Sequence, residues 1–426
     1  MKAAIRRHGV AAVAVPTFFL MKVAFGLALI KLSARDLDAF GFAAFSQLFL
    51  FSSLLNSLAS IGMQNGVIRQ VAVNPTPERI GLSLSGALLV WLVACVSAGI
   101  ALALSANLIS TLLTHTARFG GVIRWMIVGS SVIGAGQIFC SALTGLGRVG
   151  ASLFAQACGL IAGGVSALAL LAKGDAPGAV LAFVYGSALT APIAGALVVR
   201  HAAWRRYDVG RLRQEISGLL SYSGSILISG SFAPLCLFAL RYVYSSVFGL
   251  AALNNWLVAN RLSDVSTQLL GLFMAQWYLP TSARSRTLAE GRRAIAASFV
   301  VGTLVMALFA LAFWILSPVL VPLVLSRRYV SATPLIVAYM IGDVCRVSTS
   351  IAVYTALARR KMWTYLALEV LSAGLFAGLT ALLIAVRWVV APYVGYVSAF
   401  ALLAVAAWIW YARDRRAGTD LIEPAG

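Results

Sequence analysis

Six ionisable residues lie within stretches of the chain that are otherwise apolar. They are Lys22, Arg261, Asp264, Asp343, Arg346 and Glu369. On insertion scales, a charged side chain at the centre of a bilayer costs roughly 2.5–3.5 kcal/mol, so such residues usually face a polar cavity or a charged partner. Lysine and arginine in a cavity suit an anion, and carboxylates there can titrate.

Two of these residues form one pair, and two more form a second pair with the same spacing. Arg261 and Asp264 are three residues apart, and so are Asp343 and Arg346, which places both members of each pair on one helical face. In one interpretation, each pair neutralises itself and lowers the cost of insertion. In the other, these faces line a polar cavity in which the arginines bind an anion and the carboxylates titrate. The spacing is compatible with both.

Lys22 differs because its own apolar stretch contains no acid. It lies about twelve residues, or ~18 Å, into that stretch, which is too deep for its ammonium group to reach the surface easily. We expect it to pair with an acid of another helix, for which Glu369 is the unpaired candidate, or to face water or a ligand. Arg69 and Arg241 stand at the ends of two apolar stretches and are positioned to reach inward.

The composition indicates which kind of secondary-structure element carries these residues. Of the 426 residues, 61% are hydrophobic and 11% are charged, whereas an ordinary soluble protein has roughly 45–50% and 25%. The mean hydropathy of +0.92 reflects an excess spread along the whole chain. This excludes a soluble or disordered protein and a soluble domain on a single anchor. It predicts an all-α polytopic membrane protein with room for about twelve spans of ~20 residues.

Charged or Pro- and Gly-bearing breaks delimit twelve spans. The expected bounds are 10–30, 40–64, 83–107, 122–143, 151–172, 177–199, 218–240, 253–279, 294–317, 334–356, 364–386 and 392–412. The loops between them are too short for an extramembrane enzymatic domain.

The distribution of basic residues predicts the orientation. The termini and even-numbered loops hold 21 of the 33 Lys and Arg residues, and the odd-numbered loops hold nine. Since basic residues are retained in cytoplasmic loops, both termini are expected in the cytoplasm. Basic residues retained in cytoplasmic loops account for the formal net charge of +20, so no nucleic-acid partner is expected.

A basic break near the midpoint divides the spans into six and six. We therefore expect a bundle at 1–200, a cytoplasmic linker at 201–217, a second bundle at 218–412 and a cytoplasmic tail at 413–426. Similar stretches begin at Phe40 (FGFAAF) and Phe248 (FGLAAL). If they mark a repeat, the halves are related by a pseudo-two-fold axis along the membrane normal. Ala- and Phe-rich stretches also recur by chance in so apolar a chain.

The sequence lacks the residue patterns that several kinds of chemistry require. The five cysteines have no C-x-x-C spacing, the three histidines lie at the N-terminus and in loops, and a Walker motif is absent from the sequence. We expect no metal, no cofactor, no disulfide and no enzymatic activity.

Several segments resemble Wzx-type lipid-linked oligosaccharide flippases, in the same order and over nearly the whole chain. They are Gly62–Arg69, Ser263-Asp264, Tyr278–Thr281 with Arg284, Ile341–Arg346 and Leu368–Val370. The resemblance implies the fold of the multidrug/oligosaccharidyl-lipid/polysaccharide exporter superfamily, in which two six-helix bundles surround a central cationic cavity.

The resemblance also implies a function. An undecaprenyl-diphosphate-linked glycan (an O-antigen, common-antigen or exopolysaccharide repeat unit) would pass from the inner to the outer leaflet of the bacterial cytoplasmic membrane by alternating access. Polymerase and chain-length proteins would be its partners. The residues expected to bind the diphosphate are Lys22, Arg69, Arg241, Arg261 and Arg346. Asp264, Asp343 and Glu369 are expected to serve in ion coupling or as cavity carboxylates, and Glu369, which has no arginine three residues away, is the better candidate to titrate. Two alternatives stay open: a cation-coupled drug exporter of the same superfamily, and a membrane enzyme or scaffold of glycan assembly.

Overall fold

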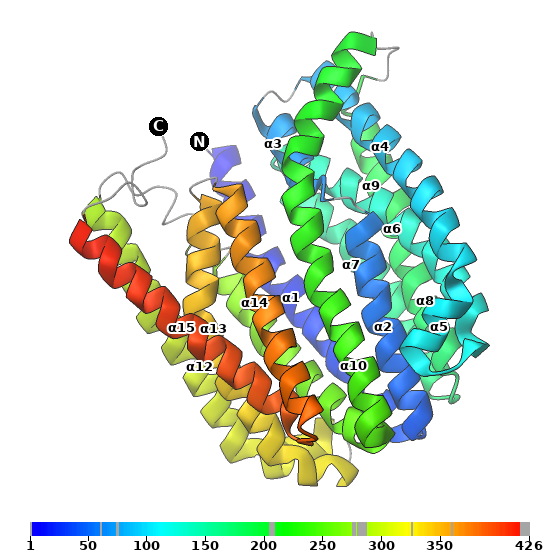
Figure 1. Ribbon diagram of the computed structural model, residues 1–426. Helices are drawn as coiled ribbons and strands as arrows, with labels where there is room; N and C mark the ends of the chain where they lie inside the picture. Colours follow the sequence, from blue (N-terminus) through cyan, green and yellow to red (C-terminus); the bar gives the residue numbers. More distant parts are fainter. Residues whose placement is uncertain are drawn as a thin grey trace. The chain divides into compact units, whose positions relative to one another are not determined.

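The computed structural model describes residues 2–59, 62–73, 76–203, 209–274, 278, 288–324, 327–358 and 361–417 (Figure 1). Within these ranges the chain is helical and contains no β-strand. The α-helices are α1 (Lys2–Asp36), α2 (Ala39–Ala59), α3 (Gln64–Val73), α4 (Pro77–Leu104), α5 (Ala106–Thr114), α6 (Gly120–Gly145), α7 (Val149–Leu171), α8 (Ala176–Ala188), α9 (Thr190–Val199), α10 (Val209–Phe273), α12 (Leu288–Val324), α13 (Thr333–Ala358), α14 (Met362–Ala385) and α15 (Ala391–Ala417). The all-α class predicted from the sequence is confirmed.

Eleven segments of the described chain are long and apolar enough to cross a membrane. One of them, Leu227–Gln268, has 42 residues and covers the seventh and eighth predicted spans. It breaks at Gly249, where φ is 80° and ψ is 175°, a conformation that favours glycine. The twelve predicted spans therefore correspond to these eleven segments, with one segment divided in two. The chain is a multi-pass membrane protein.

Polar side chains begin several helices where the sequence changes from loop to apolar stretch. The Asp38 carboxylate accepts a hydrogen bond from the Gly41 amide at 2.7 Å, and the Thr76 hydroxyl accepts one from the Arg79 amide at 3.3 Å. Asp175 accepts one from the Gly178 amide at 2.8 Å. Each cap satisfies a backbone donor that the first helical turn leaves unpaired.

The first compact unit runs from Met1 to Pro234. Its core joins residues of α3, α4, α6 and α9 with Leu219 of α10, which is completely buried. A Cβ on Gly66 would lie 3.1 Å from the Leu219 side chain, so the small residue lets α3 approach α10 closely. The first part of α10 therefore belongs to this unit.

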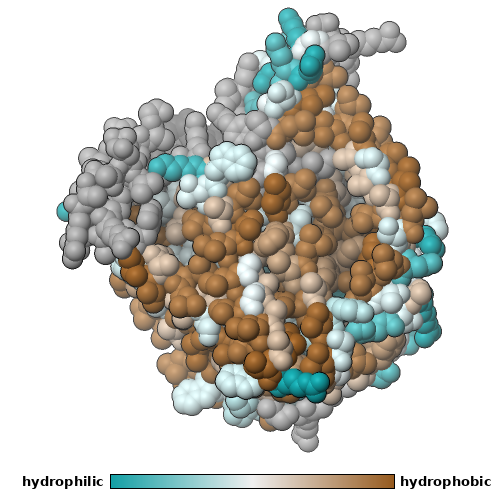
Figure 2. All heavy atoms as spheres, viewed as in Figure 1, coloured by the Kyte–Doolittle hydropathy of each residue, from teal (hydrophilic) through white to brown (hydrophobic). Residues whose placement is uncertain are grey.

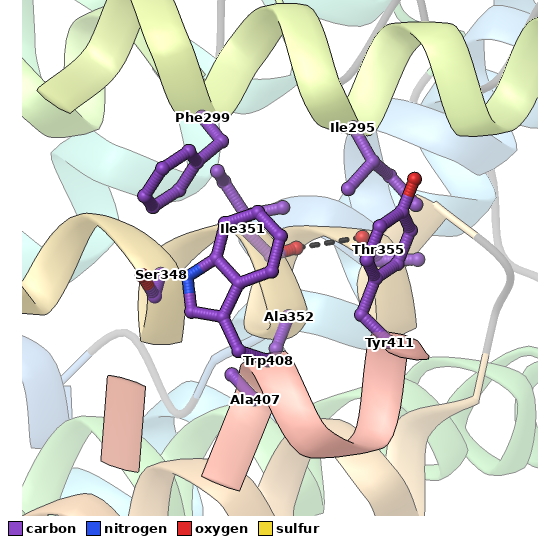
Figure 3. A pocket seen from close by; sticks show the side chains of 9 residues that line it. All are labelled: Ile295, Phe299, Ser348, Ile351, Ala352, Thr355, Ala407, Trp408 and Tyr411. Carbon is purple, nitrogen blue, oxygen red and sulfur yellow. Dashed lines mark hydrogen bonds between the residues drawn. The ribbon is translucent and has the colours of Figure 1, made fainter. Parts of the chain in front are cut away.

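The second unit runs from Leu235 to Gly426. In it α13 packs against α12, α14 and α15. Figure 3 shows Trp408 of α15 facing Phe299 of α12, with ring centroids 4.4 Å apart at an interplanar angle of 89°. The division into units thus falls within α10, after Pro234. The bundle bounds expected from the sequence stay a prediction.

Hydrophobic residues cover much of the face drawn in Figure 2. The exposed large apolar side chains include Leu104, Trp125, Ile315 and Leu382, each more than half exposed. Apolar side chains of this size on the outside of a helical protein suit contact with lipid.

Candidate functional site

Among the charged residues of the second unit whose burial is described, Asp343 of α13 is the most enclosed, with 0% of its surface exposed. Its carboxylate accepts hydrogen bonds from Ser263 at 2.8 Å, from Tyr396 at 2.6 Å and from Ser266. The preceding residue is Gly342, where a Cβ would collide with the Tyr396 ring. Glycine at this position therefore allows α15 to place the phenol against Asp343.

A second set of polar contacts joins the two parts of α10 on either side of its break. The buried Arg241 guanidinium donates to the Asn260 amide oxygen, and the Asn260 amide nitrogen donates to Asp264 at 3.3 Å. Arg261 forms an ion pair with the other Asp264 oxygen at 3.7 Å. Asp264 is therefore linked to two arginines, to Arg261 directly and to Arg241 through Asn260.

A polar cavity of about 280 Å³ lies beside these residues, also within the second unit. Helices α10, α13, α14 and α15 line it, and both Arg346 and Glu369 contribute to its wall. The Arg346 guanidinium also lies over the Phe400 ring, 5.3 Å from its centroid. We call Arg241, Arg261, Asp264, Asp343, Arg346 and Glu369 the polar cluster of the second unit.

The two pairs with equal spacing behave differently. Arg261 and Asp264 form the expected ion pair within one helix. Asp343 and Arg346 are not among the ion pairs of the described residues. The physical reason is that Asp343 has three hydroxyl donors from α10 and α15, while Arg346 faces the cavity that contains Glu369.

The other expected site residues belong to the first unit. Lys22 lies on α1 with an exposed side chain, and the ion pairs described for this chain do not include it. Arg69 lies on α3, but its side chain is outside the described residues, and so are Pro280, Thr281 and Arg284 of the resembling segments. The structure thus brings together six of the eight expected residues. The pairing of Lys22 with Glu369 stays a prediction.

Sequence reasoning missed the neutral partners of the carboxylates, which are Asn260, Ser263, Ser266 and Tyr396. One signal was present, because Ser263 and Ser266 share a face of α10 at a spacing of three residues. Tyr396 had no such signal, since its contact with Asp343 depends on how α15 packs on α13. Among the described residues, no group of three His, Cys, Asp or Glu side chains is arranged to hold a metal ion.

An ion pair of the first unit joins the start of α10, before its spanning segment, to the first turn of α4. Glu215 is 4% exposed and its carboxylate lies 2.9 Å from the Arg79 guanidinium of α4. Burial raises the pKa of the Glu215 carboxyl above its ordinary value, although the Arg79 charge acts in the opposite direction. A polar cavity of about 530 Å³, lined by α3, α4 and α10, adjoins the pair.

The arrangement of the second unit suits reversible binding of charged groups. The helical fold that carries it is the fold of known transporters. An inward-facing multidrug transporter of the MATE family and MOP superfamily aligns with a TM-score of 0.76 at 13% identity, covering 94% of each chain. The lipid II flippase MurJ, in an inward closed conformation, aligns with a TM-score of 0.74 at 10% identity, covering 94% of this chain and 87% of that one. The expected exporter-superfamily fold is therefore confirmed.

Sequence comparison identifies two relatives of this chain. The chain is 23% identical over 358 residues to the lipid III flippase of Escherichia coli (strain K12), across 82% of this chain and 85% of the relative. The lipid III flippase of Shigella flexneri matches to the same extent. No family model matches the chain. The predicted resemblance to a Wzx-type flippase is confirmed, since both relatives are lipid III flippases. These relatives are transporters and flippases, not enzymes.

Proposed function

We propose that this protein moves an undecaprenyl-diphosphate-linked oligosaccharide from the inner to the outer leaflet of the cytoplasmic membrane. The observation that carries the proposal is the sequence match to lipid III flippases over 82% of the chain. The polar cluster supports it, because a diphosphate needs cationic donors in a site shielded from water, and arginine binds such groups through several hydrogen bonds.

In this proposal the diphosphate contacts Lys22, Arg69, Arg241, Arg261 and Arg346. The lipid tail stays in the bilayer while the sugar crosses a polar path, and the two units alternate in access. Arg346 lines an open cavity, whereas Arg241 is buried and hydrogen-bonded, so Arg346 is accessible to a ligand without rearrangement.

The polar cluster supports a role for protons as well. Glu369 lines the cavity, so water can deliver a proton to it, whereas Asp343 is completely enclosed. We propose that the diphosphate competes with the carboxylates for the arginines, which links substrate binding to proton uptake, and that Glu369 is the group that takes up the proton.

A direct test uses the purified full-length protein in liposomes with a fluorescent undecaprenyl-diphosphate-linked oligosaccharide. Transbilayer movement faster than in protein-free liposomes is expected. Movement at the rate of protein-free liposomes, with a correctly folded protein, would remove the proposal. In cells, mass spectrometry of a deletion strain should show the lipid-linked precursor accumulating, and the accumulated species identifies the glycan.

Variants of Lys22 test the binding role. Lys22→Ala is expected to abolish transport at a normal protein level, because it removes a cation, and Lys22→Arg is expected to keep part of the activity. Lys173→Ala is the matched control, since Lys173 is an exposed lysine in the short loop between α7 and α8. Full activity of Lys22→Ala would show that Lys22 does not bind the diphosphate.

Glu369→Gln tests coupling. Glutamine keeps the shape of the side chain and most of its packing but cannot take up a proton at neutral pH. We expect the response of transport to an imposed pH gradient to disappear. Wild-type transport with an unchanged response to the gradient would exclude Glu369 as the coupling residue.

The two alternatives predict other outcomes of the same assay. A drug exporter would leave the labelled lipid in place and move an organic cation, for which an acidic cavity is preferable to one that balances arginines and carboxylates. A membrane enzyme or scaffold would move neither compound.

A further inference from the structure

A second, mostly apolar groove adjoins the polar cavity in the second unit. It has a volume of about 290 Å³ and lies between α13, α14 and α15, with Thr349 in the walls of both cavities. The α14 residues that line it, Thr364, Leu368 and Leu371, recur every three or four residues, so the groove follows one face of that helix.

The groove has a buried floor and an exposed rim. Thr349, Thr355 and Leu403 of the floor are each less than one-tenth exposed, whereas Leu371 on the rim is 53% exposed. A chain-like ligand can therefore enter sideways along the helix. A smaller cavity adjoins the groove where α12 packs on α13 and α15, and aromatic rings of α12 and α15 leave it a volume of only about 30 Å³ (Figure 3).

One end of the groove is cationic. Lys361, the residue before α14, lines it, and the ion pairs of the described residues do not include Lys361. In the sequence it is the last of three consecutive basic residues, Arg359-Arg360-Lys361. The first exposed aromatic side chain after Lys361 is Trp363, which is 81% exposed. Lysine and tryptophan at the end of an apolar helix are typical of the headgroup level of a bilayer.

The length of the groove indicates what fills it. From Lys361 to Leu371 is ten residues, or ~15 Å along a helix. This equals half of a hydrocarbon core of ~30 Å, which is the depth of one leaflet. A phospholipid acyl chain has this reach, whereas a long polyprenyl chain exceeds it. The volume, at the lower end of the range for ligand sites, suits one hydrocarbon chain.

We infer that this groove binds an anionic phospholipid of the bilayer, with one acyl chain along α14 and the phosphate at Lys361. The site is separate from the proposed glycan-lipid path but shares Thr349 with the cavity of Arg346 and Glu369. Occupation of the groove would therefore support the α13 face that carries Arg346.

The test is native mass spectrometry of the full-length protein in detergent with added phosphatidylglycerol, phosphatidylethanolamine or undecaprenyl phosphate. Since a basic residue near an anionic headgroup contributes about a fivefold preference, wild type should bind phosphatidylglycerol about fivefold more tightly than phosphatidylethanolamine. Lys361→Gln should bring the ratio close to one, and Lys173→Gln, the charge control, should not change it.

A second pair of variants tests the groove itself. Ala406 is an exposed alanine on the rim, and Ala406→Phe should fill the groove and weaken binding of both phospholipids. Ala367 is an exposed alanine of α14 that does not line the groove, so Ala367→Phe should bind them as wild type does. An unchanged lipid ratio in Lys361→Gln would overturn the inference. Displacement of phosphatidylglycerol by equimolar undecaprenyl phosphate would also overturn it, by assigning the groove to the polyprenyl lipid.

Discussion

At the scale of single residues, Asp343 shows how the protein stabilises a buried charge without a cation at contact distance. Three hydroxyl groups from two helices donate to its carboxylate. Hydrogen bonds to a charged group are stronger than those between neutral groups, so each donor contributes to the packing of α10 and α15 on α13.

Replacing Tyr396 tests this. Tyr396→Phe keeps the ring but removes one donor to Asp343, so we expect the free energy of unfolding to fall by about 1–2 kcal/mol. Thermal unfolding in detergent measures the change. Tyr393→Phe is the control, because the buried Tyr393 hydroxyl has no hydrogen-bond partner in the described structure. Its removal should be neutral or stabilising, and equal losses in the two variants would contradict the role given to the Tyr396 hydroxyl.

At the scale of secondary-structure elements, the break in α10 depends on one glycine. Gly249 has a positive φ of 80° with an extended ψ of 175°, and space around it is open. Gly249→Ala should therefore destabilise the protein by about 1–3 kcal/mol through backbone strain alone.

Gly378 of α14 provides the matched comparison for this variant. It also has open space around it, but it lies inside a helix with ordinary dihedral angles. Gly378→Ala is expected to stabilise the protein by about 0.5–1 kcal/mol, since alanine is the better helix former. Thermal unfolding of both variants gives the comparison. A neutral Gly249→Ala would mean that α10 passes this point without a break.

The start of α10 is fixed to α4 by a buried ion pair, and its pH dependence has a defined sign. The folded Glu215 carboxyl holds its proton to a higher pH than the unfolded one, because burial raises its pKa above 4.5. The stability that the protonated Glu215 carboxyl contributes is therefore fully present below pH 4.5, and it is lost as the pH rises through the raised pKa.

Glu215→Gln should remove this dependence. Compared with the variant, wild type should become relatively more stable as the pH falls from about 8 to about 4. Unfolding midpoints of both proteins across this range measure the effect. Glu78→Gln, at an exposed carboxylate one residue before Arg79, controls for the loss of a negative charge nearby. A gain of relative stability for wild type at high pH would show that the attraction of Arg79 outweighs burial.

The elements were more predictable than the contacts between them. Hydrocarbon requires continuous apolar helices, so composition alone located the spans, and the break between the spans at 218–240 and 253–279 falls at Gly249. The i,i+3 rule was right for Arg261 and Asp264, whose contact lies within one helix. It did not identify the partners of Asp343, because the hydroxyls that bind Asp343 come from helices packed against it, and packing has no local sequence signal.

At the scale of the whole molecule, the orientation in the membrane is the prediction with the most consequences. In a cysteine-free background, Lys173→Cys is expected to react with a membrane-impermeant maleimide in intact cells, and Arg211→Cys only after permeabilisation. Cys95, Cys140, Cys158, Cys236 and Cys345 must first be replaced, since all five are free thiols. Labelling of Arg211→Cys in intact cells would reverse the orientation.

The charge balance of the polar cluster bears on how voltage acts on this protein. Its three arginines and three carboxylates cancel, so a membrane potential exerts no net force on the empty cluster as a whole. One proton added to any of its acids gives the cluster a charge of one, on which 100 mV acts with about 2.3 kcal/mol. A bound diphosphate carries negative charge instead, and an inside-negative potential drives that charge outward. Electrical recording from membranes that contain the protein would thus register the outward movement of the anionic cargo, whereas the empty cluster by itself would contribute no current.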